Sequence, residues 1–271
     1  MTEIAQERDY YSIVFTFNIP PKFFFKNQII EVLTLKEEKA EIIKSKKVDH
    51  IIFQEFNEEF ANLDAEKFIK IKLIEELNLK ILIIGDDHKF GKDNSGNFDK
   101  LKELSTKYNF ELIKIDTTYV NDNRVSSSNV RNALKNGNID FANSLLGYKY
   151  FVVGEIIAGK QIGRKIGFPT ANLLVHPEKI LPQNGVYVVT AQVENRTYEG
   201  ICNIGYRPSI NMSKKVTIEV HLIDFREFIY GQKIKVSFWW KIREEQKFNN
   251  HEELVNQIYK DKKFAINFFS K

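Results

Sequence analysis

The sequence holds one cysteine, Cys202, so an internal disulfide is excluded and a reducing compartment is expected, which favours the cytoplasm. Nothing near Cys202 in the chain suggests an activated thiol, and we expect a small buried residue in a strand. No apolar run approaches the roughly 20 residues of a membrane span. Met1–Asp9 is too polar and acidic for a secretory signal. These absences exclude secreted disulfide scaffolds and membrane-embedded proteins.

Positive residues exceed negative residues only slightly, because the formal net charge is +4. Lysines alternate with glutamates over 36–44 and 65–77, as on solvated helix faces. No basic stripe with interleaved aromatics is present, which argues against a nucleic-acid partner. His176 and His251 lack metal-ligand spacing and are expected on the surface. The modest positive balance still favours small anionic ligands.

The first half of the chain alternates short apolar runs with helical patterns, which predicts a parallel, doubly wound α/β sheet. A capping box at Thr34 and Glu37 predicts a helix to about Ser45. A further helix is expected from Ser128 to Asn136, capped by Ser126 or Ser127. The other expected elements are strands at 13–17, 51–53, 80–85 and 111–115 and helices at 65–77 and 99–108.

The hydrophobic period changes to two after Gly147. Val216–Leu222 and Ile234–Arg243 alternate apolar and polar residues, as half-buried strands do. With runs at 151–157, 186–193 and 198–204, they predict about six short antiparallel strands that close into a small barrel. Asn250 is expected to cap a C-terminal helix over 251–264. The chain of 271 residues is therefore divided into domains 1–146 and 147–271.

The segment GKQIGRKIGFPTAN, residues 159–172, has the residue types of a nucleotide-phosphate loop. Its glycines, Gly159, Gly163 and Gly167, allow a backbone to approach a phosphate closely, and Arg164 and Lys165 neutralise negative charge. A hydroxyl and an amide oxygen at its end, from Thr170 and Asn172, suit a magnesium ion that keeps water and phosphate ligands. The spacing differs from the common phosphate loop, which has four residues between glycines before Lys-Ser/Thr.

The Pro-Thr-Ala-Asn run at 169–172 resembles the signature of riboflavin kinases. Further segments follow in that family's order: Leu181-Pro182, Gly185-Val186-Tyr187, Asn203-Ile204-Gly205, Arg207-Pro208, Glu219-Val220-His221-Leu222 and Tyr230-Gly231. Nearly the whole chain resembles the bacterial family that joins riboflavin kinase to FMN adenylyltransferase (FAD synthetase). The resemblance implies a Rossmann-like nucleotidyltransferase domain followed by a six-stranded riboflavin kinase barrel with a C-terminal helix.

The resemblance also implies roles for particular residues. Glu219 matches the proposed catalytic base, and the loop would bind ATP, with Thr170 and Asn172 on Mg²⁺. Arg243, Phe248 and Trp239 are candidates to line the flavin-ring site, because flat heteroaromatic rings bind in pockets with apolar walls and a few polar groups. Without the resemblance, each feature has an ordinary structural explanation. Glu219 fits a solvated glutamate on a strand, and Thr170 and Asn172 fit turn caps. The loop glycines fit a corner of the barrel, and the three flavin candidates fit outward side chains on a terminal strand.

The adenylyltransferase half departs from the family pattern. The segment Gly-x-Phe-Asp-Gly-x-His-x-Gly-His, which follows the family's first strand, has no counterpart in the sequence, so we expect a sheet without that strand and with exposed edges. The motif Thr-Phe-Asp-Pro-His-Pro is replaced by Thr-Phe-Asn-Ile-Pro-Pro at 16–21. A remnant of the ATP and flavin sites is expected at Ser126, Ser127, Arg131 and Asp87, although a bare helix cap also explains the serines.

The leading interpretation is an enzyme that transfers the γ-phosphate of ATP to the riboflavin 5′-hydroxyl and forms FMN. Adenylylation of FMN to FAD is expected to be poor in this chain, since the α-phosphate donors supply the main electrostatic stabilisation. One alternative is a full bifunctional enzyme, if the natural chain starts upstream. Another is a flavin- or nucleotide-binding regulator without catalysis, against which an intact Thr170, Asn172 and Glu219 argue. The sequence leaves the oligomeric state open.

Overall fold

The computed structural model describes residues 1–18, 31–85, 89–159, 163, 167–207 and 215–270. The chain forms two compact units, each described separately below. The first comprises Met1–Ile30 and Thr34–Tyr119, and the second comprises Glu31–Leu33 and Val120–Lys271. The second unit therefore begins before the domain boundary that we predict at residue 147, and it includes the two helices that precede the barrel.

Parallel strand pairs form the framework of the first unit. Strand β1 (Ile13–Phe17) pairs in parallel with β2 (His50–Gln54), and β3 (Ile81–Gly85) pairs in parallel with β4 (Glu111–Ile115). The parallel pairing agrees with the α/β prediction. Among the described residues the pairs remain separate two-stranded ladders.

The helices of the first unit differ locally from the prediction. The backbone N–H of Leu35, and not that of Thr34, donates the capping hydrogen bond to the Glu38 carboxylate at 2.9 Å, so the expected capping box was one residue early. The helix expected over 65–77 is a short α-turn followed by a π-helix, η1, in which Glu76 donates to the carbonyl of Ile71. The helical segments are α1 (Thr2–Glu7), α3 (Lys36–Lys44), α4 (Glu58–Ala61), α5 (Ala65–Lys67), η1 (Phe68–Glu75), η2 (Lys92–Asn94) and α6 (Phe98–Tyr108).

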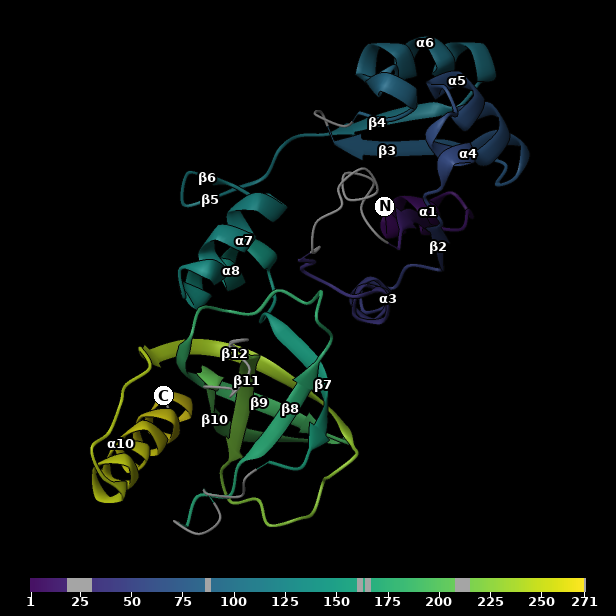
Figure 1. The fold of residues 1–271 in the computed structure, drawn as a ribbon. Coiled ribbons are helices and arrows are strands. Elements are labelled where there is room, and N and C mark those ends of the chain that lie inside the picture. The colour runs from purple at the N-terminus through teal and green to yellow at the C-terminus, as the bar shows by residue number, and fades with distance from the viewer. Residues whose placement is uncertain (19–30, 86–88, 160–162, 164–166, 208–214, 271) are drawn as a thin grey trace. The chain divides into compact units, whose positions relative to one another are not determined.

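A closed antiparallel barrel dominates the second unit, with strand order β10-β11-β8-β7-β12-β9 (Figure 1). This confirms the predicted six-stranded barrel. The strands are β7 (Phe151–Ile157), β8 (Ala171–Val175), β9 (Gly185–Val193), β10 (Arg196–Arg207), β11 (Lys215–Leu222) and β12 (Lys233–Arg243). A further short ladder, β5 (Tyr119–Val120) with β6 (Asn123–Arg124), precedes the barrel.

The barrel interior is filled by alternate residues of its strands, as period-two patterning predicts. Ile218 and Val220 of β11 are at most 3% exposed, and Cys202 of β10 is fully buried among them. Burial raises the pKa of the Cys202 thiol, which keeps it protonated. The expected role of Cys202 as a small buried strand residue is confirmed.

Among the described residues of the second unit, three helices accompany the barrel. Helix α7 (Ser127–Lys135) begins at Ser126, whose side chain accepts from the N–H of Asn129, and α8 (Ile139–Leu146) follows. The C-terminal helix α10 (His251–Phe269) is capped by Asn250, as predicted, and continues for longer than predicted. Its Ala265 packs on Val188 and Ile201, which lie on the outer face of the barrel.

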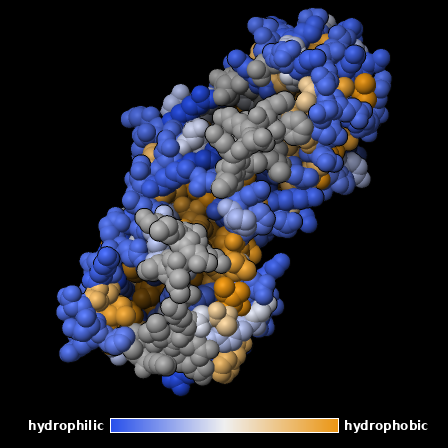
Figure 2. All heavy atoms as spheres, in the orientation of Figure 1, coloured by the Kyte–Doolittle hydropathy of each residue, from blue (hydrophilic) through white to orange (hydrophobic). Residues whose placement is uncertain are grey.

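The visible face in Figure 2 is largely hydrophilic, with scattered apolar groups. None of the helices in the described part of the chain has the length and apolarity that a bilayer crossing requires.

Candidate active site

The polar residues of highest interest meet in one row across three barrel strands. Glu219 of β11 lies opposite Asn172 of β8 on one side and opposite Asn203 of β10 on the other. Directly opposed residues of antiparallel strands have Cα atoms about 4.5–5.5 Å apart and side chains on the same face. Because Ile218 and Val220 point inward, Glu219 faces outward with its two neighbours. The structure therefore brings Glu219 and Asn172 together, although 46 residues separate them in the chain.

Two glycines of the loop, Gly159 and Gly163, lie against the residues at its C-terminal end. A Cβ atom built on Gly159 would lie 2.1 Å from Nδ2 of Asn172, and one on Gly163 would lie 2.2 Å from the Phe168 carbonyl and 3.2 Å from Oγ1 of Thr170. Gly167 has a φ of +85°, a left-handed conformation that favours glycine. The N–H of Phe168 donates to the Gly163 carbonyl at 2.8 Å and closes the turn. The predicted ligand Arg164 lies outside the described residues.

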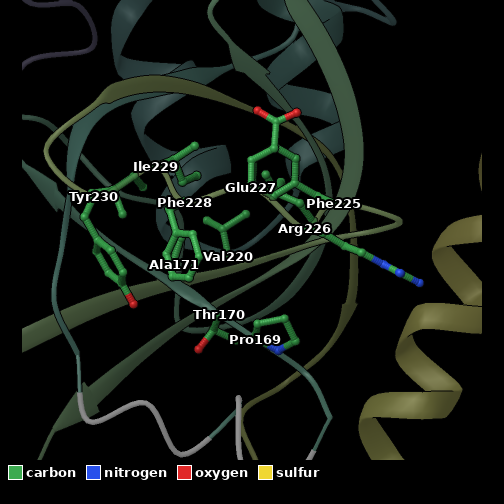
Figure 3. Close-up of a pocket in the computed structure, with 12 residues that line it drawn as sticks. Pro169, Thr170, Ala171, Val220, Phe225, Arg226, Glu227, Phe228, Ile229 and Tyr230 are labelled. Carbon is green, nitrogen blue, oxygen red and sulfur yellow. The ribbon is translucent and has the colours of Figure 1, made fainter.

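A cavity of about 270 Å³ opens beside Thr170. One wall contains Pro169 and Thr170, and another is the segment 225–230 that follows β11 (Figure 3). Val220, Leu222 and Ile156 complete an apolar lining. Figure 3 shows the Arg226 side chain extending away from the other labelled residues. Because an apolar cavity of about 150 Å³ already holds benzene, this cavity has room for a bicyclic aromatic ring.

A second, wider groove of about 980 Å³ is lined by residues of β8 and β11, among them Asn172 and Thr217, and by much of the segment 176–184. Lys179 is buried at its far side, where its ammonium donates to the Leu33 carbonyl at 2.7 Å and lies over the Tyr150 ring. Lys135 in the same groove pairs with Glu31 at 2.5 Å. Thr170 and Asn172 thus line different hollows, with only Ala171 between them in the chain.

The three flavin-ring candidates are distributed over β12 and the segment after it. Arg243 lies opposite Val186 in the same barrel row as Glu219, and its guanidinium lies 5.8 Å from the Phe248 ring. Trp239 instead donates to Thr190 at 3.1 Å and packs on the last turn of α10. Thr190 lies four residues along β9 from Val186, about 13 Å at 3.3 Å per residue. The structure does not bring Trp239 together with Glu219.

Arg243 also joins α10 to the barrel. Its guanidinium donates to both carboxylate oxygens of Asp261, at 2.8–3.1 Å, and the two side chains are 16% and 2% exposed. We expect Asp261→Ala to destabilise the barrel unit by about 3–5 kcal/mol, because it leaves a buried guanidinium without its partner. Urea unfolding followed by alkylation of Cys202 measures this, since the only thiol of the chain is buried in the barrel.

Glu244→Ala is the matched control for that variant. Glu244 is 68% exposed and forms a surface pair with Lys241 at 2.6 Å, so its loss should cost less than about 1 kcal/mol. Equal unfolding midpoints for the two variants would contradict the structural role of the Arg243–Asp261 pair.

The adenylyltransferase candidates lie in and near α7. Ser126 uses its side chain to cap the helix, Ser127 is the first helical residue, and Arg131 donates to the Glu31 carbonyl at 3.4 Å. Burial lowers the pKa of Arg131. Asp87 lies outside the described residues.

Several residues of the site are not evident from sequence patterning. Asn203 appears in the sequence only as part of the Asn-Ile-Gly motif, and its place beside Glu219 follows from the strand register. Glu245 is identified by its carboxylate oxygen, which lies 2.0 Å from a Cβ built on Gly205. Gly205 stands within the Asn-Ile-Gly motif, which is the one signal in the sequence that something must approach the backbone there.

Comparison with known proteins places the two halves in defined families. A riboflavin kinase family model matches residues 146–269, and an FAD synthetase family model matches residues 1–129. A bifunctional riboflavin kinase/FMN adenylyltransferase of Buchnera aphidicola (from Schizaphis graminum) is 40% identical over 99% of this chain and 87% of its own length. A protein of the same description from Bacillus subtilis is 37% identical over 99% of this chain and 85% of its own length.

A solved structure matches nearly the whole chain. A crystal structure described as a macrolide-efflux protein from Streptococcus pneumoniae matches with a TM-score of 0.90 and 28% identity, and covers 98% of this chain and 86% of that one. Given the two family models and these relatives, the chain belongs to the family of bifunctional riboflavin kinase/FMN adenylyltransferases, which are transferases.

Proposed function

We propose that the barrel unit transfers the γ-phosphoryl group of ATP to the 5′-hydroxyl of riboflavin and releases FMN and ADP. The observation that carries the proposal is the pairing of Glu219 with Asn172 next to the glycine-rich loop. Phosphoryl transfer needs charge neutralisation at the phosphate, alignment of the acceptor and a group that takes the acceptor proton. We assign charge neutralisation and alignment to the loop, and acceptance of the proton to Glu219 in the strand row.

Each substrate has a region of the site that suits its chemistry. The apolar cavity beside Thr170 suits the adenine ring, with the phosphates directed toward Thr170 and Asn172. The acceptor alcohol approaches on the outer face of β11, beside Glu219, whose neighbour Asn172 lines the wider groove. Glu219 accepts the hydroxyl proton, the freed oxygen bonds to the γ-phosphorus, and the bond to the bridging β–γ oxygen breaks.

A divalent cation fits the polar end of the loop. Within the described ranges no group of three or more His, Cys, Asp or Glu residues could hold a metal by itself. Thr170 and Asn172 instead offer a hydroxyl and an amide oxygen in the space that Gly159 and Gly163 leave open. This sparse neutral donor set suits Mg²⁺, which retains water and binds substrate phosphates. When bound, the ion would neutralise charge on the β- and γ-phosphates.

The experiment that tests the function is incubation of the 271-residue chain with riboflavin and MgATP, with chromatographic separation of FMN and FAD. We expect FMN to accumulate, with FAD at no more than a few per cent of it. FAD formation should be slow because the chain has no counterpart of the family's His-x-Gly-His segment, whose donors act on the α-phosphate. Rapid conversion of FMN to FAD would contradict the expected weak adenylyltransferase activity, and absence of FMN would contradict the proposed kinase activity.

A binding protein without catalysis is the competing function. It would retain riboflavin and ATP without turnover, and Glu219 would then have no chemical task. We place the reaction in the cytoplasm, where MgATP is available and a reduced Cys202 is stable.

A further inference from the structure

The loop arm that ends at Thr170 is held by a side chain of β11, His221. Its Nδ1 lies 2.9 Å from the Pro169 carbonyl oxygen. A carbonyl oxygen only accepts, so Nδ1 carries the proton and donates. His221 is 7% exposed, and its Nε2 is buried without a hydrogen-bond partner among the described residues. The ring is therefore committed to one polar contact, the one with the loop.

Aromatic packing fixes the same arm from the other side. The Phe168 ring meets the His221 ring edge-on at 5.4 Å and the Tyr259 ring of α10 edge-on at 4.8 Å. Phe168 is itself only 3% exposed. The residue before Pro169 is thus wedged between β11 and α10, and the hydrogen bond to His221 fixes the carbonyl that precedes Thr170.

His221 is also neutral, which suits its position. Burial lowers its pKa and outweighs the hydrogen bond to the Pro169 carbonyl, which acts in the opposite direction, and nearby Lys262 lowers the pKa further. A neutral imidazole donates to the Pro169 carbonyl without adding a positive charge that would compete with the loop and the metal ion for the phosphates. Glu219 and His221 stand two residues apart on the same face of β11, about 7 Å along the strand. One strand therefore carries both the proton acceptor and the anchor of the phosphate loop.

We propose that His221 is a positioning residue that sets Thr170 relative to Glu219 through the Pro169 carbonyl. The inference rests on the proposed kinase function and deepens it. The hydrogen bond and the ring contacts do not touch the substrates, so their loss should alter the alignment of the transferring phosphate more than the binding of riboflavin. A displacement of about 1 Å at a reacting centre can cost about 10²-fold in rate.

Two substitutions separate positioning from packing. His221→Leu keeps much of the ring's volume and removes the donor, whereas His221→Asn keeps an N–H donor close to the position of Nδ1. We expect His221→Leu to lower kcat for FMN formation by about 10–100-fold, with KM for riboflavin changed by less than about threefold. We expect His221→Asn to retain kcat within about fivefold of the unsubstituted chain.

His50→Leu is the matched control, because His50 is an exposed histidine of the first unit, and we expect it to leave kcat unchanged. Melting temperatures are measured for all the variants. The proposal is overturned if His221→Leu keeps full kcat, or if a His221→Asn variant that melts at the temperature of the unsubstituted chain is as slow as His221→Leu. Absence of FMN with the unsubstituted chain would instead overturn the proposed function, so the two failures are distinguishable.

Discussion

Glu219→Gln is expected to lower kcat for FMN formation by about 10²–10⁴-fold, the usual contribution of a general base. The change keeps the size and hydrogen-bonding capacity of the side chain and removes its ability to take a proton. Glu219 faces outward between Asn172 and Asn203, where a glutamine of the same size can replace it without altering the barrel interior. The affinity for MgADP, measured by calorimetry, should therefore change by less than about threefold, while turnover falls.

Glu199→Gln is the control for this result, since Glu199 is an exposed residue of β10 opposite Thr190. It carries the same chemical change on a neighbouring strand, away from the row of Glu219. We expect wild-type turnover. If Glu219→Gln also retained near-normal kcat, Glu219 would not be the proton acceptor.

Gly159→Ala is expected to lower kcat by about 10²-fold with little loss of stability. The new methyl group would lie 2.1 Å from Nδ2 of Asn172, and the Asn172 amide is the end of a side chain that can turn away. The clash is thus relieved by moving a predicted phosphate and metal ligand, and not by unfolding the barrel. A misplacement of about 1 Å at that ligand accounts for the loss of rate.

A double-mutant cycle tests this explanation. Asn172→Ala should lower kcat by a similar factor, and the Gly159→Ala/Asn172→Ala double variant should be no slower than Asn172→Ala alone, because both changes remove the same interaction. If instead the two reductions in kcat multiply, Gly159 acts independently of Asn172 and the steric account is wrong.

The barrel was largely predictable because its strands repeat with a period of two. Ile218 and Val220 alternate with Glu219, and this alternation alone predicts β11 and the outward direction of the carboxylate. Strand β8 was not predicted. It is only five residues long, and its first two residues, Ala171 and Asn172, belong to the motif that ends the glycine-rich loop. The pairing of Asn172 with Glu219 arises from barrel closure, which leaves no trace in local sequence.

Other differences have similar physical causes. Alternation puts Trp239 on the same strand face as Arg243, but the last turn of α10 covers that face where Trp239 lies. The apolar pattern of Phe68–Glu75 fits an α-helix as well as the π-helix observed, because hydrogen-bond spacing does not follow from composition. His221 was predicted on the polar face of β11, yet its bond to Pro169 depends on how the loop returns to the barrel.

The central claim is that the glycine-rich loop and Glu219 meet over a single alcohol, and a crystal structure with riboflavin and a non-hydrolysable MgATP analogue tests it most directly. The account predicts the riboflavin 5′-oxygen within about 2.6–3.2 Å of a Glu219 carboxylate oxygen, with the γ-phosphate next to Thr170 and Asn172. A ribityl chain that ends away from Glu219, or a triphosphate bound elsewhere on the barrel, would contradict it.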